Sequence, residues 1–333
     1  MNSHQNIQVC DLSSPLPQEL QGGVIAIGNF DGLHRGHQMV LQHTQMLAAG
    51  LGVPCLVLSF EPHPKTLFRP DKPVFRLTPL DMKARVLDAI GLNGLAVLPF
   101  TKEIAATGAR EFVERFLVQH AGAAHVVSGF NFHFGKGREG SPQFLTQTGA
   151  EFGFGVTIID AHEDSSDEVI SSSRIRACLA DGDVSKASEL LGYRWCVGGE
   201  VVKGAQLGRT LGFPTANLEL PLESELAHGI YAVRMRRSTG TLFNGVASYG
   251  RRPTFDNGKA LLETFVFDFA DDLYGEQIEV SLFKWLRPEE KFDSAETLVE
   301  QMNIDSRQAK EYLASVKPLS KLDNELTFEG LVT

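Results

Sequence analysis

Two histidines stand three residues apart at the end of a glycine-rich segment, Gly-Asn-Phe-Asp-Gly-Leu-His-Arg-Gly-His, which supplies His34 and His37. The segment follows an apolar run and precedes a stretch of helical periodicity. We therefore expect it between the carboxyl end of a strand and a helix N-terminus, where parallel sheets bind phosphate groups. Two imidazoles on one face of that helix could donate hydrogen bonds to phosphate oxygens and stabilise charge during attack on an α-phosphate. The alternative is a pair of surface histidines on an ordinary turn.

A serine-rich segment and two loops could complete this site. Ser171, Ser172 and Ser173 begin a predicted helix, where their hydroxyls can cap the helix and meet phosphate, and Arg176 can pair with a pyrophosphate. The loop 129–138 combines aromatic residues with glycines and suits a flat ring, and the Phe-Glu-Pro-His-Pro turn at 60–64 suits the edge of a ligand. The alternatives are a serine cap with solvated arginines, a loop folded under its own aromatic side chains, and a rigid turn.

A second glycine-rich stretch, residues 203–217, could bind another phosphate group. Its glycines would let backbone amides approach phosphates, although it lacks the Gly-Lys-Ser/Thr of a Walker motif. Thr215 and Asn217 at its end offer the oxygen ligands that Mg²⁺ favours. The alternative is a structural loop whose glycines only make turns.

Glu263 stands on the apolar face of a predicted strand. Side chains alternate across a strand, so Glu263 shares a face with Leu261, Phe265, Phe267 and Phe269. A carboxylate there is costly unless it is paired or functional, and burial would raise its pKa and make it a better proton acceptor. We expect a general base; the alternative is a salt bridge to Arg251 or Arg252.

The elements that must position these residues change character along the chain. The first half alternates strands with helices, which predicts a parallel α/β sheet with helices on both faces. We expect strands at 24–28, 53–60, 95–100, 125–130 and 156–160, and helices at 37–49, from Thr78-Pro79 to Gly91, around 112–117 and after Ser141-Pro142. Thr78 and Ser141 are the expected N-caps, and Leu80, Ala84 and Leu87 form the apolar face of the helix after Thr78.

After residue 192 the apolar runs are separated by turns, which predicts an antiparallel sheet or small barrel. We expect strands at 197–202, 230–236, 241–248, 261–269 and 278–286, and a hairpin turn at 238–240. Two helices are expected at 294–302 and 305–315, with Ser294 and Asp305 as their capping residues. The predicted domains are 1–190 and 191–320, with a tail at 321–333.

The amino-acid composition argues against several classes of protein. The 333 residues are 43% hydrophobic with a net charge of −10, which excludes disorder and argues against a nucleic-acid partner or an anionic-membrane partner. Apolar runs are short, the first twenty residues lack a secretory signal, and the four cysteines form no Cys-x-x-Cys pair. We expect a cytoplasmic protein. The sequence does not decide between a monomer and a weak homo-oligomer.

The first half resembles the adenylyltransferase module of bacterial bifunctional riboflavin kinase/FAD synthetases. The shared motifs, in order, are G-x-F-D-G-x-H-x-G-H, F-x-P-H-P, G-x-N-F-x-F-G and I-S-S-x-x-I-R. The resemblance implies a Rossmann-like nucleotidylyltransferase fold in which His34, His37 and Arg176 act on ATP. The implied ATP contacts are Gly28, Phe30, Asp31, Gly32, Gly36, Ser171, Ser172 and Ser173. The implied flavin contacts are His63, Asn131 and Phe132.

The second half resembles the riboflavin kinase domain, a small antiparallel β-barrel. G-R-T-L-G-F-P-T-A-N at 208–217, G-x-R-P-T-F at 250–255 and E-x-x-x-x-D-F-x-x-D-L-Y-G at 263–275 carry the likeness. It implies that Thr215 and Asn217 serve Mg²⁺ and ATP and that Glu263 activates the ribityl 5′-hydroxyl. Phe265 stands where the family often has His. Further implied ATP contacts are Gly204, Gly208, Arg209, Thr210 and Gly212.

These resemblances predict a two-step flavin enzyme. Riboflavin takes the γ-phosphoryl group of ATP to give FMN, and the FMN phosphate then attacks the α-phosphorus of a second ATP to give FAD and pyrophosphate. Catalysis would be mainly positioning and charge neutralisation by Mg²⁺ and cationic side chains. The competing hypotheses are a nucleotidylyltransferase for pantetheine phosphate or nicotinamide mononucleotide, an aminoacyl-tRNA synthetase, and a non-catalytic flavin-binding protein. The second domain and the absence of a Lys-Met-Ser-Lys-Ser-like loop argue against the first two, and the intact site residues against the third.

Overall fold

The chain folds as two compact units, residues 1–172 and 173–333, and each has its own apolar core. The computed structural model describes residues 7–160, 162–164, 168–204, 207–251 and 260–330. This division precedes the boundary expected at residue 190, because helices α7 (Ser172–Ala180) and α8 (Val184–Leu191) fold with the second unit. Where the two activities separate along the chain stays a prediction.

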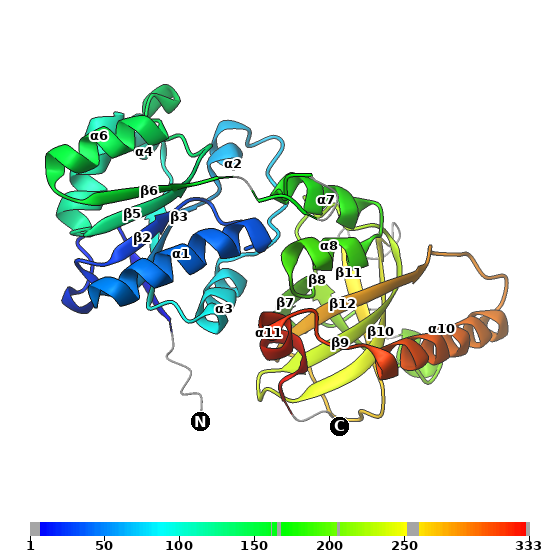
Figure 1. The fold of residues 1–333 in the computed structure, drawn as a ribbon. Helices are drawn as coiled ribbons and strands as arrows, with labels where there is room; N and C mark the ends of the chain where they lie inside the picture. Colours follow the sequence, from blue (N-terminus) through cyan, green and yellow to red (C-terminus); the bar gives the residue numbers. More distant parts are fainter. Residues whose placement is uncertain (1–6, 161, 165–167, 205–206, 252–259, 331–333) are drawn as a thin grey trace. The chain divides into compact units, whose positions relative to one another are not determined.

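The first unit is built on a parallel sheet with the strand order β1-β4-β3-β2-β5-β6 (Figure 1). Its strands are β1 (Gln8–Asp11), β2 (Val24–Ile27), β3 (Cys55–Glu61), β4 (Gly94–Pro99), β5 (His125–Gly129) and β6 (Gly155–Ile159). The five expected strands are present, whereas β1, half-exposed and partly polar, was not predicted. Because β2 has its successor β3 on one side and β5 on the other, the carboxyl end of β2 is a topological switch point, where open α/β sheets bind ligands.

Helices cover both faces of this sheet. Helices α1 (Arg35–Leu51) and α3 (Leu80–Ile90) lie on one face, whereas α6 (Pro142–Phe152), α4 (Lys102–Ala105), α5 (Ala109–Phe112) and η2 (Val113–His120) lie on the other, where Ile25 and Ile27 join the core. Ser141 caps α6 as expected, since its hydroxyl accepts a hydrogen bond from the Phe144 N–H at 3.2 Å. The short helix α2 (Pro64–Phe68) follows β3.

Two predicted helix ends were wrong. Helix α1 continues through Gly50 to Leu51 and ends at Gly52, whose φ of 67° is the left-handed conformation that favours glycine. Thr78 does not cap α3, because Pro79 occupies the capping position and the Thr78 hydroxyl instead accepts a hydrogen bond from the Gly32 N–H at 2.9 Å. This bond ties the start of α3 to the glycine-rich segment.

The second unit is a six-stranded antiparallel sheet with the order β7-β12-β9-β10-β11-β8. Its strands are β7 (Cys196–Glu200), β8 (Thr215–Glu219), β9 (Gly229–Arg237), β10 (Leu242–Arg251), β11 (Ala260–Val266) and β12 (Gln277–Arg287), with the expected turn at 238–240 joining β9 to β10. A bridge between Val202 and Asn217 links the two edges, so the barrel is nearly closed. Strand β8 was not predicted, because its residues end the glycine-rich stretch.

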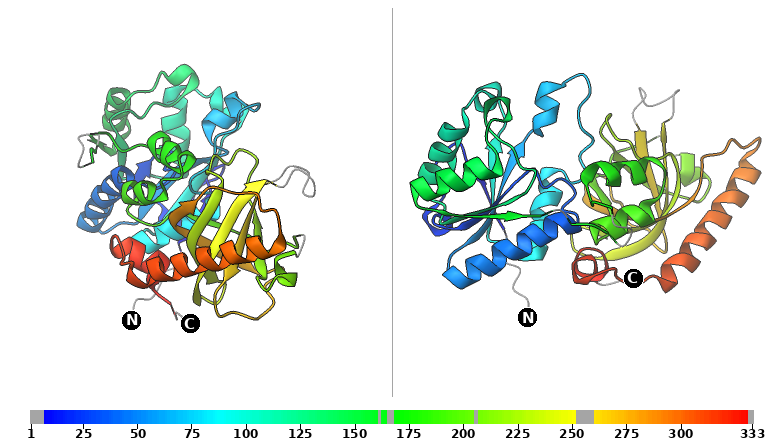
Figure 2. Two further views of the ribbon diagram at one scale, coloured as in Figure 1. Left: turned by 90° about the vertical axis from the view of Figure 1, so that its right-hand side faces the viewer. Right: turned by 45° about the horizontal axis from the view of Figure 1, so that its top comes forward.

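One continuous helix, α10 (Ala295–Ser315), replaces the two helices expected near the end of the chain and packs on β9, β10 and β12 (Figure 2). Asp305 is no cap: its buried carboxylate accepts from the Arg287 guanidinium at 2.7 and 2.9 Å. Beyond it, α11 (Lys321–Asp323) and η4 (Asn324–Phe328) bury Asp323 against Arg194 and pack Phe328 on Phe283. Within the described ranges no helix has the length and hydropathy to cross a membrane.

Candidate active sites

The glycine-rich turn after β2 has an unusual backbone. Phe30, Gly32 and Leu33 have φ values of 47°, 86° and 42°, in the left-handed region that side chains rarely adopt. Burial of Phe30 and Leu33 fixes these conformations, together with Asp31, whose carboxylate accepts from the N–H groups of Leu77 and Thr78 at 3.0 and 3.1 Å. Such strain persists where packing over-determines it, commonly at functional sites. Asp31 therefore anchors the turn through its side chain.

Two of the expected glycines are required by close packing. A Cβ at Gly36 would lie 3.2 Å from His34 Nδ1, and one at Gly28 would lie 3.2 Å from the Phe30 ring. Larger side chains at either position would displace the groups that shape the turn.

His34 and His37 meet at the start of α1. Their rings stack with centroids 3.7 Å apart and planes 17° from parallel, and His34 Nδ1 accepts a hydrogen bond from the His37 N–H at 3.3 Å. Because Nδ1 is an acceptor here, the proton of neutral His34 must lie on Nε2. His37 Nδ1 is buried and has no hydrogen-bond partner in the described part of the chain.

Both imidazoles are neutral at pH 7. The pKa of His34 is lowered from 6.5 to about 4, chiefly by burial and also by a nearby His162, while Asp31 opposes the shift. The pKa of His37 lies well below its usual range, chiefly through burial and then through the charges of His34 and Lys83. The pair therefore offers hydrogen-bond donors, not cations, to an incoming phosphate.

Lys83, which was not predicted, lies beneath this turn. It is 1% exposed on α3, and its ammonium donates to the Asn29 carbonyl oxygen and to Ser59 Oγ, each at 2.8 Å. The sequence did hold a signal, since Lys83 lies three residues after Leu80 and four before Leu87, both expected on the apolar face of that helix.

A second cationic group joins two of the loops. Arg76 donates to both carboxylate oxygens of Glu61 at 2.6 and 2.7 Å, and its Nε lies 4.0 Å from the Asp31 carboxylate. Arg76 thus links the end of β3 to the glycine-rich turn.

The loops predicted to meet the flavin lie at the carboxyl ends of β3 and β5. His63 is buried, and its Nδ1 caps α2 by accepting from the Lys65 N–H at 3.2 Å. Asn131 is exposed, and Phe132 stacks on Phe134 with centroids 5.6 Å apart. Phe68 and Phe130 are 67% and 47% exposed and provide apolar surface that the motifs did not identify.

A hydrogen bond connects the serine segment to the glycine-rich turn. Ser172 Oγ donates to the Asp31 carbonyl oxygen at 2.8 Å. Ser171 is half-buried; Ser173, exposed, and Arg176, half-buried, continue along α7 beyond the division of the chain. The roles of Ser173 and Arg176 stay predictions.

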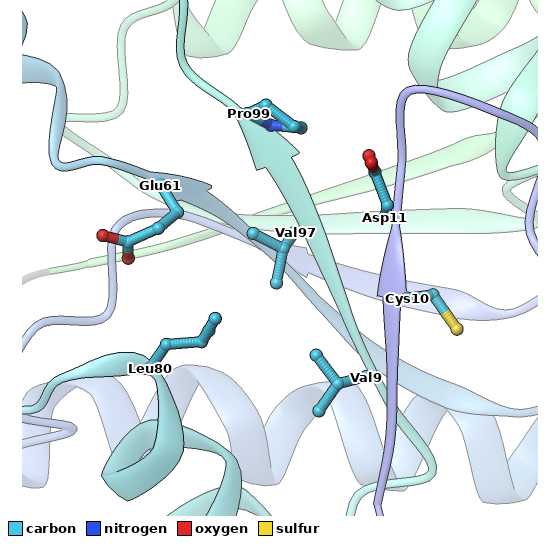
Figure 3. A pocket seen from close by; sticks show the side chains of 7 residues that line it. All are labelled: Val9, Cys10, Asp11, Glu61, Leu80, Val97 and Pro99. Carbon is cyan, nitrogen blue, oxygen red and sulfur yellow. The ribbon is translucent and has the colours of Figure 1, made fainter.

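A pocket of about 320 Å³ lies apart from the histidines, on the edge of the sheet (Figure 3). Glu61 on β3 and Asp11 on β1 lie on either side of Val97 on β4. The remaining lining residues are Val9, Cys10, Leu80 and Pro99, so the pocket contains none of the predicted site residues.

In the second unit, the pairing of β8 with β11 brings the predicted kinase residues together. Asn217 lies opposite Glu263, and Thr215 lies opposite Phe265, so all four share one face of the sheet. Asn217 is 3% exposed, and Thr215 Oγ1 donates to its Oδ1 at 3.2 Å. Two ligands at neighbouring corners of a Mg²⁺ octahedron are about 3 Å apart, so these two oxygens fit that ion.

Glu263 is less buried than expected. Glu263 and Phe265 are half-buried, whereas Leu262, Thr264 and Val266 on the opposite face are buried. On the face of Glu263 itself, Leu261 and Phe267 are buried and Phe265 packs against the core, so Glu263 is a half-buried carboxylate on a largely apolar face, opposite the buried Asn217. The alternative partner Arg252 lies outside the described residues, as do residues 252–255 of the Gly-x-Arg-Pro-Thr-Phe motif.

The predicted phosphate loop packs tightly on β8. A Cβ at Gly204 would lie 2.5 Å from Asn217 Nδ2, and one at Gly208 would collide with the Phe213 carbonyl oxygen. Gly212 has a φ of 86°, and Thr210 ends α9 (Leu207–Thr210). The Arg209 guanidinium lies 6.0 Å from the centre of the Tyr274 ring, and Lys203 lies 5.6 Å from it, so both cations flank this loop.

Comparison with known proteins assigns both units. A family model for FAD synthetase matches residues 16–174, and one for riboflavin kinase matches residues 191–313. Bifunctional riboflavin kinase/FMN adenylyltransferases of Escherichia coli K12 and Bacillus subtilis are 39% and 33% identical to the chain. These matches cover 92% and 91% of this chain and 96% of each relative.

A solved structure from Streptococcus pneumoniae, titled a macrolide-efflux protein, matches with a TM-score of 0.80 and 30% identity, covering 93% of this chain and 100% of that one. Its title names another role, but its fold is shared along nearly the whole length. The two family models and the curated relatives agree with the two sites described above. The chain belongs to the family of bifunctional riboflavin kinase/FMN adenylyltransferases, which phosphorylate riboflavin to FMN and adenylylate FMN to FAD.

Proposed function

We propose that His34 and His37 stabilise the ATP phosphates during adenylylation, and that Glu263, beside Thr215 and Asn217, activates riboflavin for phosphorylation. The observation that carries this assignment is the convergence of each set of side chains: a stacked histidine pair at the switch point of one sheet, and three polar residues on one face of the other.

In the adenylyl step, the FMN phosphate attacks the α-phosphorus of ATP and pyrophosphate leaves. Neutral His34 can donate its Nε2 proton to an α-phosphate oxygen as negative charge shifts there, and its buried position strengthens that bond. Arg176 would offset negative charge on the departing pyrophosphate, and the hydroxyls of Ser171, Ser172 and Ser173 would donate hydrogen bonds to it. The backbone from Gly28 to Gly36 would hold the nucleotide, and His63, Asn131 and Phe132 would contact the flavin.

In the kinase step, the ribityl hydroxyl of riboflavin attacks the γ-phosphorus of ATP and ADP leaves. Glu263 would accept the hydroxyl proton, while Gly204, Gly208, Arg209, Thr210 and Gly212 hold the phosphates. Thr215 Oγ1 and Asn217 Oδ1 would hold Mg²⁺, which when bound neutralises phosphate charge. The half-exposed position of Glu263 supports this role because a substrate can reach it.

The substrates also support a cytoplasmic location, where ATP is made and used. An overall charge of −10 supports the absence of a nucleic-acid partner.

A reciprocal pair of substitutions tests both assignments. His37→Ala should lower FAD formation from supplied FMN by about 10²–10³-fold, the usual cost of losing one donor at a developing charge. Glu263→Gln should lower FMN formation from riboflavin by about 10²–10⁴-fold, the usual contribution of a general base. Each variant should keep the other activity, measured by chromatography of the flavins.

Matched controls carry the same substitutions nearby. His43→Ala lies on α1, where His43 bonds to the Met39 carbonyl of its own helix, and Glu219→Gln lies on β8 with an exposed side chain. Both controls should keep both activities. Equal loss of the two activities in a folded His37→Ala protein would refute the assignment of the sites to separate units.

A further inference from the structure

Among the described residues, the buried ammonium of Lys83 donates to no carboxylate. Its two bonds run to neutral oxygens, the Asn29 carbonyl and the Ser59 hydroxyl, and Ser59 Oγ donates in turn to the same Asn29 oxygen at 3.1 Å. An ammonium has three protons to donate, so one remains without a protein acceptor in the described part of the chain.

Packing alone does not explain a lysine at this position. Its neighbours on the buried side of α3 are Met82, Val86 and Leu87, and an apolar side chain would cover the sheet as well. Burying an ammonium without a paired carboxylate costs free energy that a methionine would not. The Asn29 carbonyl also has a second donor in Ser59, so its hydrogen bonding does not require the lysine.

The surroundings of Lys83 point toward the ATP site. Its charge acts on His37, and the buried Asn29 Oδ1 and His37 Nδ1 atoms both lack partners among the described residues. Asn29 immediately follows Gly28 at the carboxyl end of β2, so the ammonium holds the first bend of the strained turn.

We propose that Lys83 is a positioning residue for adenylyl transfer: its ammonium fixes the Asn29 carbonyl, and with it the turn Gly28–His34, in the conformation that receives ATP, and adds positive charge behind the histidine pair. This inference rests on the proposed role of His34 and His37.

The charged groups around Lys83 give the proposal a pH signature. The pKa of Lys83 is lowered from 10.5 to about 8, chiefly by burial and then by the charge of Arg76, while Asp31 and Glu61 oppose the shift. His37 is neutral above pH 7 and Arg76 stays charged, so neither titrates between pH 7 and 10. Lys83 loses its charge in that range, and adenylyl transfer should fall with it.

The test is Lys83→Met, which keeps the length and apolar stem of the side chain but removes the charge. We expect kcat for FAD formation from FMN to fall about 10²-fold, the cost of displacing reacting groups by about 1 Å, with little change in KM for FMN. Riboflavin phosphorylation should be unchanged, and the melting temperature at pH 7 should not fall. Lys102→Met, an exposed lysine on α4, is the control and should change nothing.

The pH profile is the second measurement. In the wild type, kcat for FAD formation should decrease as the pH rises through about 8, relative to FMN formation by the same protein, and this limb should be absent in Lys83→Met. Normal kcat in Lys83→Met, or a loss that only follows a loss of folded protein, would overturn the proposal. If the variant does not fold, a wild-type profile that is flat from pH 7 to 10 would overturn it.

A comparison with His37→Ala separates this inference from the assignment of the site. If His37→Ala keeps FAD formation, the assignment itself fails. If His37→Ala loses FAD formation and Lys83→Met keeps it, only the role of Lys83 fails.

Discussion

Replacing His34 by Asn separates the structural and chemical roles of this side chain. Asparagine is a good N-cap, and its Oδ1 can accept the His37 N–H in place of His34 Nδ1, so α1 should keep its cap. The variant lacks the Nε2 donor, and FAD formation from FMN should therefore fall by about 10²–10³-fold. Riboflavin phosphorylation should continue.

The same variant should change how the first unit responds to acid. The pKa of His34 is about 4 in the folded protein, against 6.5 when the chain unfolds. The unfolded chain therefore binds more protons between these values, and the free energy of unfolding falls as the pH drops from about 6.5 through 4. His34 contributes about 3 kcal/mol to that fall, and His34→Asn should remove this contribution.

The aromatic residues of the chain allow this to be measured. Trp195 and Trp285, the two tryptophans, both lie in the second unit, so tryptophan fluorescence follows that unit, whereas circular dichroism follows both. Unfolding in urea is followed by both probes at pH 7, 5.5 and 4.5. The transition that circular dichroism detects and tryptophan fluorescence does not is the unfolding of the first unit, and it gives the stability of that unit. An equal acid response of wild type and variant would refute the burial argument, and normal FAD formation would refute the role of Nε2.

Two further predictions concern the second unit. Asp323→Ala leaves the buried Arg194 guanidinium without its carboxylate and should destabilise this unit by about 3–5 kcal/mol. Urea unfolding followed by tryptophan fluorescence measures this loss, and an unchanged transition would show that the pair is dispensable. A fragment of residues 173–333 should fold and form FMN, whereas residues 191–333 lack α7 and α8 and should melt at lower temperature; equal melting of the two fragments would contradict the division at residue 172.

Local signals explain most of what the sequence predicted correctly. The parallel strands carry short apolar runs, Ser141-Pro142 begins α6, and Gly91 ends α3, because each depends on residues within one turn or one strand. One error has a local cause and the other a long-range one. Gly50 was expected to end α1, but the helix tolerates it. Asp305 has the residue type of a helix cap, but its carboxylate pairs with Arg287, which approaches it only when β12 and α10 pack together.

The candidate sites divide in the same way. The motifs alone determined which residues belong together, since His34 and His37 lie three apart on a helix and Thr215 and Asn217 lie two apart on a strand. Only the tertiary structure decided that Asn217 lies opposite Glu263, because that contact depends on the register of β8 against β11. It also decided the neutral state of the histidines and the place of Lys83 beneath Asn29, because burial and long-range hydrogen bonds arise from packing and not from spacing along the chain.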